Sequence, residues 1–114
     1  MNKNNKLLEN SKEFAILIIK TFDFEKYDSL NNQILRSGTS IGANIREAQY
    51  AQSMLDFINK LEIALKECYE TEYWLEIFYK TERINENSFL TLRNKAGLLR
   101  KLLISSIKSA KSQL

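Results

Sequence analysis

The chain has 114 residues, of which 44% are hydrophobic and 27% charged, and a formal net charge of +3. This balance suits one soluble domain with a continuous core and excludes a chain that is disordered throughout. There is no proline and there are only three glycines, which favours long helices over the many turns of an all-β fold. The longest purely apolar run, residues 14–19, is far shorter than the roughly 20 residues of a membrane-spanning helix.

These totals predict a single all-α domain over residues 1–114 that does not enter a membrane. The N-terminal residues are polar and show no secretory signal pattern. The lone Cys68 cannot form an internal disulfide, which agrees with a reducing compartment. We therefore expect the protein to be cytoplasmic.

The first helix is predicted from about Asn10 to Asp23. Asn10 is a favourable N-cap residue, and Glu13 stands three residues later, as a capping box requires. Residues 1–9 would precede this helix as a flexible segment. The run of Ile and Leu could also form a buried strand, but the length of the segment favours a helix. So do three apolar residues at four-residue spacing, Phe14, Ile18 and Phe22.

The second helix is predicted to begin near Asp28, another capping residue. Gly38 and Gly42 lie one turn apart inside it, and each costs a helix about 1 kcal/mol relative to alanine. Close approach of another helix would offset this cost, whereas a break between Ser37 and Gly42 is the alternative. The predicted core stripe is Leu30, Ile34, Gly38, Ile41, Ile45 and Ala48.

The third helix is predicted to start at the capping box Ser53-Met-Leu-Asp56 and to continue to about Arg83. The fourth should start near Asn85 and run almost to the end. The predicted apolar seam of the third helix comprises Phe57, Leu61, Ala64, Cys68, Thr71, Leu75 and Phe78. The seam of the fourth helix comprises Leu92, Ala96, Leu99, Leu103, Ile107, Ala110 and Leu114. Four amphipathic helices joined by short loops predict an antiparallel up-down four-helix bundle.

The third helix also carries apolar residues on the side opposite its seam, and a helix that is apolar on two sides is usually covered on both. These residues are Leu55, Ile63, Tyr73, Trp74 and Ile77. We expect a contact between copies of the chain here, with Tyr73 and Trp74 as anchors. The alternative is a central helix that its own bundle surrounds.

A polar edge follows the core stripe of the second helix. Its members are Arg36, Ser37, Ser40, Asn44 and Glu47. If buried, such groups need hydrogen-bond partners, either on the third helix or on a neighbouring subunit. A solvent-facing edge is equally compatible with the spacing.

Catalysis is not expected. The chain contains no histidine, which is the commonest general base and metal ligand, and a single cysteine cannot form a structural zinc site. Cys68 lies on the seam of the third helix and is interpreted as a small buried residue rather than a reactive thiol. Glu67 and Glu70 fit the solvated or interfacial side of a helix. We expect no metal and no cofactor.

Charge is unevenly distributed: residues 56–86 carry four basic and eight acidic groups, whereas residues 87–114 carry six basic groups and no acidic one. The basic residues are Arg93, Lys95, Arg100, Lys101, Lys108 and Lys111. They could bind the phosphates of RNA or DNA. They could equally oppose the helix dipole and keep the surface soluble. No aromatic residues alternate with them to stack on bases.

Three stretches resemble a known family: R36-S-G-T-S-I-G-A-N-I-R-E-A48, S53-M-L-D-F57 and L61-E-I-A-L-K-E-C-Y-E-T-E-Y-W-L75. The chain is similar, over about residues 10–108, to bacterial four-helix bundle proteins first described from intervening sequences in 23S rRNA genes. Cys68 departs from the more usual alanine. The motif residues are Arg36, Ser40, Asn44, Glu47, Asp56, Glu67, Glu70, Thr71, Tyr73 and Trp74.

The resemblance implies a cytoplasmic bundle that assembles into a ring, commonly a pentamer, with the motif residues serving assembly and packing. A related accessory protein of diversity-generating retroelements binds nucleic acid and a reverse transcriptase. The family's molecular role is otherwise poorly defined. We therefore expect a non-enzymatic oligomeric scaffold that binds a partner protein, with RNA or DNA binding through the basic C-terminal helix as the alternative.

Overall fold

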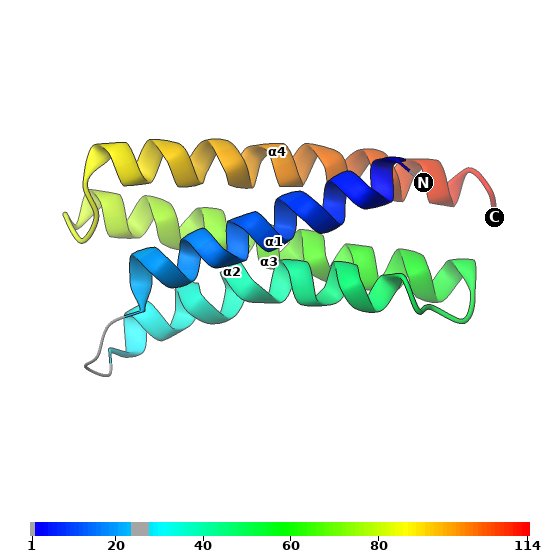
Figure 1. Ribbon diagram of the computed structural model, residues 1–114, viewed down its shortest axis with the longest axis horizontal. Coiled ribbons are helices and arrows are strands. Elements are labelled where there is room, and N and C mark those ends of the chain that lie inside the picture. Colours follow the sequence, from blue (N-terminus) through cyan, green and yellow to red (C-terminus); the bar gives the residue numbers. More distant parts are fainter. Residues whose placement is uncertain (1, 24–27) are drawn as a thin grey trace.

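The computed structural model describes residues 2–23 and 28–114 and, within them, the side chains from Lys6 onward. It contains four helices, α1 (Asn2–Phe22), α2 (Ser29–Ala48), α3 (Met54–Lys80) and α4 (Glu86–Lys111). Successive helices run in opposite directions, so that the α2–α3 connection lies at the same end as both termini (Figure 1). No strand occurs in the part of the chain described. The predicted all-α, antiparallel up-down four-helix bundle is confirmed.

The helices form the corners of a square, in chain order around the bundle axis. The backbones of α1 and α2, α2 and α3, α3 and α4, and α4 and α1 approach one another closely. Across the α1–α3 diagonal, the rings of Phe22 and Phe78 meet in the core with centroids 5.4 Å apart. Each helix therefore packs side by side with two neighbours and turns one side away from the bundle axis. In particular, α3 is not a central helix that the others surround, and its outer side is left uncovered by its own chain.

Three of the four predicted helix starts are confirmed. The Asp28 carboxylate accepts hydrogen bonds from the backbone N–H groups of Leu30 and Asn31. Ser53 Oγ accepts one from Asp56 N at 3.0 Å, and Asn85 Oδ1 accepts one from Ser88 N at 2.8 Å. Each cap satisfies N–H groups that have no partner inside the helix. The end of α3 comes three residues before the predicted Arg83.

The predicted start of the first helix at Asn10 is wrong, because α1 already begins at Asn2. Asn10 is an interior residue whose Nδ2 donates to the carbonyl oxygen of Lys6 at 2.8 Å. Leu7 is fully buried in the core. Burial of this leucine extends the helix beyond the capping signal, because packing contributes more to helix stability than a cap does. The predicted flexibility of the first nine residues is not tested by a static structure and stays a prediction. Met1 lies outside the described residues.

The core is one continuous cluster with contributions from all four helices. Most of the predicted seam residues are buried, and three are not. Leu30, in the first turn of α2, is 40% exposed, and Leu114, beyond the end of α4, is 72% exposed. Phe57 is half-buried near the start of α3, where Ile58 instead is fully enclosed.

Gly38 and Gly42 allow α1 to approach α2 closely, as the sequence predicted. A Cβ atom on Gly38 would lie 3.0 Å from both Cγ1 and Cγ2 of Ile18, and one on Gly42 would lie 3.3 Å from Ser11 Oγ. The helix runs unbroken through both residues. The alternative of a break between Ser37 and Gly42 is therefore wrong.

Candidate interaction surface

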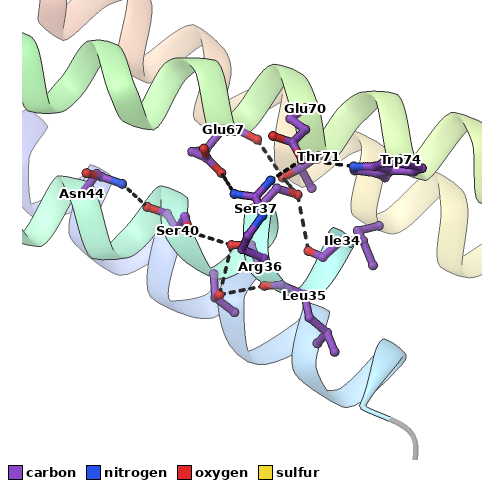
Figure 2. A network of polar contacts seen from close by, with 11 residues as sticks. Ile34, Leu35, Arg36, Ser37, Ser40, Asn44, Glu67, Glu70, Thr71 and Trp74 are labelled. Carbon is purple, nitrogen blue, oxygen red and sulfur yellow. Dashed lines mark hydrogen bonds and ion pairs between the residues drawn. The ribbon is translucent and has the colours of Figure 1, made fainter. Parts of the chain in front are cut away.

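The motif residues of α2 and α3 meet in a polar network, shown in Figure 2, which we call the Arg36 cluster (Arg36, Glu67, Glu70 and Trp74). Arg36 Nη1 lies 3.1 Å from Glu67 Oε2, and Arg36 Nη2 donates to Glu70 Oε2. The same Glu70 oxygen accepts a hydrogen bond of 3.2 Å from the indole Nε1 of Trp74. One guanidinium therefore joins two carboxylates, one of which also holds the tryptophan.

Helix periodicity brings these side chains together. Glu67, Glu70 and Trp74 follow one another at steps of three and four, so they project from the same side of α3. Arg36 projects from the facing side of α2 and reaches across with a planar fork that suits two carboxylates. Arg36 is 49% exposed and Glu70 34%, so the cluster lies at the rim of the α2–α3 contact rather than in the core.

The ionised forms of the cluster are favoured. Burial of Glu70 opposes its ionisation, but hydrogen bonds from Arg36 and Trp74, together with the positive charge of Arg36, outweigh burial and lower the pKa of the carboxyl. The hydrogen bond to Glu70 raises the pKa of Arg36, against the effect of burial and with the help of the charge of Glu67. The cluster is therefore an ion pair at neutral pH.

Some of the other residues on the polar edge of α2 bond to α3, and others bond within α2 itself. Ser37 is buried and lies 2.9 Å from Thr71 Oγ1, while Glu47 pairs with Lys60 at 3.2 Å, so both reach α3. Ser40 and Asn44 instead bond to carbonyl oxygens of their own helix. The predicted bonds to the third helix are thus formed by part of the edge only.

Asp56, another motif residue, lies outside the Arg36 cluster. Its backbone N–H donates to Ser53 Oγ, and its Oδ2 accepts from the backbone N–H of Gln52 at 3.3 Å. Its role in this chain is to close the first turn of α3.

The outer side of α3 presents a row of apolar and aromatic side chains, which we call the α3 outer surface. Leu55 is 57% exposed, Ile63 43% and Tyr73 56%. Trp74 and Ile77 are half-buried and pack against the core. Tyr69, which is 51% exposed, completes the row. Tyr69 was not predicted as part of this surface, although its position one turn before Tyr73 was a usable signal.

Trp74 is held by rings as well as by the Glu70 carboxylate. Its ring centroid lies 5.1 Å from that of Tyr73 and 6.3 Å from that of Phe78, with interplanar angles of 71° and 61°. Edge-to-face contacts of this kind are favourable. Trp74 therefore connects the core residue Phe78 with the exposed Tyr73.

The basic groups of α4 are partly neutralised by α3. Arg100 Nε lies 3.0 Å from Glu72 Oε1, and Lys111 Nζ lies 3.2 Å from Glu62 Oε2. The guanidinium of Arg93 lies over the ring of Phe89, 5.5 Å from its centroid. Three lysines are exposed and form no ion pair within residues 2–23 and 28–114: Lys95, Lys101 and Lys108.

Cys68 is fully buried, as predicted, and its Sγ lies 3.3 Å from the carbonyl oxygen of Ala96. Burial, and to a lesser degree the charge of Glu72, raises the pKa of this thiol to about 12 against the opposing effect of Arg100. The thiol is therefore protonated and unreactive. Among the side chains described from Lys6 onward, no three His, Cys, Asp or Glu residues converge as metal ligands would.

None of the helices, over the residues described, combines the length and the apolar character required to cross a membrane. The geometry thus defines an all-α four-helix bundle whose distinctive polar residues connect α2 to α3. The sequence profile of the 23S rRNA-intervening sequence protein family matches residues 3–105, and the chain belongs to that family.

A solved structure supports both the fold and the family. The chain is similar to a protein of unknown function from the S23 ribosomal protein family of Bacteroides thetaiotaomicron, whose crystal structure was determined at 1.70 Å resolution. The two share 52% identity and superpose with a TM-score of 0.89 over 93% of this chain and 98% of the other. No curated protein matches the chain.

Proposed function

We propose that this protein is a non-enzymatic interaction scaffold whose copies assemble through the α3 outer surface, in a ring that then binds a partner protein. The observation that carries the proposal is the row of exposed apolar and aromatic residues on the uncovered side of α3, with Tyr73 and Leu55 each more than half exposed. Contiguous apolar patches of this kind mark interaction sites on soluble proteins. The pentameric ring that the family resemblance implies is part of the proposal.

Further support comes from the composition of this surface. Aromatic residues are enriched at the centres of interfaces because they bury a large apolar area at a low cost in side-chain entropy. Tyr69, Tyr73 and Trp74 lie within two turns of one helix. Catalysis is not part of the proposal, since the chain has no histidine and its only thiol is buried. We also propose a cytoplasmic location.

The test is the solution mass of matched variants, measured by sedimentation velocity. Ile63 on α3 and Ile16 on α1 are exposed to a similar extent, 43% and 46%. Wild type and Ile16→Glu should both sediment as oligomers of the 13.3 kDa chain, whereas Ile63→Glu should be monomeric. A wild type that stays monomeric at high concentration, or equal effects of the two variants, would contradict the proposal.

RNA or DNA binding is a second candidate, favoured by the three exposed lysines of α4 that form no ion pair with the part of the chain that the structure describes. A ring would repeat these charges, and avidity grows with each repeat. We would measure the fluorescence anisotropy of a labelled RNA across a salt series. Binding that weakens with salt and is lost in Lys101→Glu/Lys108→Glu, but retained in Lys6→Glu/Lys20→Glu on α1, would support this function. Absence of binding at low salt would leave the protein scaffold.

A further inference from the structure

We infer that Glu70, held in place by Arg36, is a positioning residue for Trp74, which it fixes so that the indole ring rather than its N–H is offered to a second copy of the chain. The inference rests on the proposed self-association, but the positioning itself is a property of the single chain. Three observations support it: the shared Glu70 oxygen, the ring contacts of Trp74 and the charge balance of the cluster.

The shared oxygen connects Arg36 to Trp74. Glu70 Oε2 accepts from Arg36 Nη2 and, at 3.2 Å, from Trp74 Nε1. A glutamate side chain on a helix surface normally samples several rotamers, and the ion pair with α2 restricts this one. Because Glu70 is restricted, the acceptor for the indole N–H has a defined position one helical turn away.

The ring contacts complete the restriction of the indole. Phe78 contacts one part of the ring from the core side, and Tyr73 lies edge-to-face with it on the outer side. A hydrogen bond at Nε1 and two ring contacts together oppose rotation about both side-chain torsions of Trp74. The aromatic pair Tyr73–Trp74 therefore forms a shaped, pre-organised surface, which reduces the entropy lost on association.

The indole N–H of Trp74 is already hydrogen-bonded within the chain, and this determines what kind of contact the surface can make. Tryptophan has a single donor and no acceptor. Since that donor is already bonded to Glu70 within the chain, a second copy needs to supply only apolar surface at this point. Without Glu70, the N–H would be buried unpaired on association, at the cost of its desolvation.

The charge balance makes Arg36 necessary for this arrangement. Glu67 and Glu70 are three residues apart on one helix face, a spacing at which like charges repel. Arg36 bonds to both and so allows them to remain side by side. Loss of the guanidinium should therefore release Glu70 and, with it, Trp74. Lysine would keep the charge but not the two-pronged geometry.

The test uses Trp74 as the only tryptophan in the chain. Time-resolved fluorescence anisotropy in the Ile63→Glu background reports rotation of the indole in the monomer. Arg36→Met and Glu70→Ala should give the largest increase in the amplitude of fast local rotation of the indole. Arg36→Lys should increase this amplitude less. Glu70→Gln should increase it least, because glutamine keeps a hydrogen-bond acceptor. Lys60→Met is the matched control because it removes another α2–α3 ion pair, with Glu47, away from the indole.

Thermal unfolding followed by circular dichroism verifies that each variant is folded. If Arg36→Met does not fold, Arg36→Lys still tests the inference. Unchanged rotation in the Arg36 variants, or an equal increase in the Lys60→Met control, would overturn the positioning role.

A second arm measures assembly of the same variants without Ile63→Glu. Loss of a charge-assisted hydrogen bond that orders an interface residue should weaken assembly by roughly tenfold in Arg36→Met. Full-strength assembly with a freely rotating indole would overturn the inferred link to the second copy. If the wild type does not assemble at all, the proposed function fails, while the rotation measurement still decides whether Glu70 positions Trp74.

Discussion

Thr71 on α3 and Ser37 on α2 are joined by a hydrogen bond of 2.9 Å between their hydroxyl oxygens, at a point where both residues are fully buried. Thr71 Oγ1 also lies 2.8 Å from the carbonyl oxygen of Glu67 in its own helix. This pair is a polar contact among the mainly apolar buried residues of α2 and α3. It lies beneath the Arg36 cluster and fixes the register of α2 against α3 at the level where that cluster forms.

Removal of either hydroxyl should lower the free energy of unfolding, and removal of both should lower it by less than the sum of the two single effects. Thr71→Val and Ser37→Ala should each lower the free energy of unfolding by about 1–2 kcal/mol, since the remaining buried hydroxyl loses its partner on the facing helix and keeps only a carbonyl oxygen of its own helix. The double variant should lose less than the sum, by about 1 kcal/mol. Urea unfolding of the four proteins measures this coupling, and strict additivity would mean that the two hydroxyls act independently.

Two glycines should respond to alanine with opposite signs. At Gly38 the new Cβ would lie 3.0 Å from two carbons of the buried Ile18, so Gly38→Ala should destabilise the bundle by about 1–2 kcal/mol. At Gly97 the nearest atom is Arg100 Nη2 at 3.6 Å, and Gly97→Ala should stabilise by up to about 1 kcal/mol through helix propensity. Chemical denaturation of both variants checks the prediction. Stabilisation by Gly38→Ala would show that the α1–α2 contact can relax.

The early start of α1 should contribute to stability. Leu7 is fully buried in the core, whereas the adjacent Lys6 is exposed. We expect Leu7→Ala to cost about 2–4 kcal/mol of unfolding free energy, because it leaves a cavity, and Lys6→Ala to cost almost nothing. If Leu7→Ala melts at the same temperature as wild type, the first turns of α1 do not hold the bundle together in solution.

Cys68 should be protected from thiol reagents in the folded protein. Its side chain is inaccessible, and burial raises its pKa to about 12, so almost no thiolate exists near pH 8. A chromogenic disulfide reagent should label one thiol per chain rapidly in urea. In native buffer, labelling should be far slower, at a rate set by opening of the bundle. Rapid stoichiometric labelling of the folded protein would contradict this expectation.

The contribution of Glu70 to stability should depend on pH. Its pKa is lower in the folded chain than the ordinary value of 4.5, so its contribution is present above that value and is lost as pH falls through the lower folded pKa. Because Arg36 and Glu70 are both partly exposed, Glu70→Gln should cost less than about 1 kcal/mol at pH 7. The difference between the two proteins should vanish in acid, as measured by thermal unfolding across pH. A difference that persists or grows in acid would contradict the assignment.

The sequence by itself determined the number of helices, their seams and three of their starts. Those features depend on local chemistry: the spacing of apolar residues sets which side of a helix is buried, and Asp28, Ser53 and Asn85 cap the N–H groups that immediately follow them. The outer side of α3 was likewise visible, because helix geometry places Ile63 and Tyr73 opposite Cys68 without reference to any other helix.

Only the tertiary structure decided which polar groups meet. Arg36 and Glu70 are 34 residues apart, and their contact depends on the register of α2 against α3. The same holds for Arg100 with Glu72, which reduces a basic patch that looked continuous along one helix. The start of α1 was missed because burial of Leu7 by the other helices, and not the capping box at Asn10, decides where that helix begins. Packing between distant segments outweighs local signals wherever the two compete.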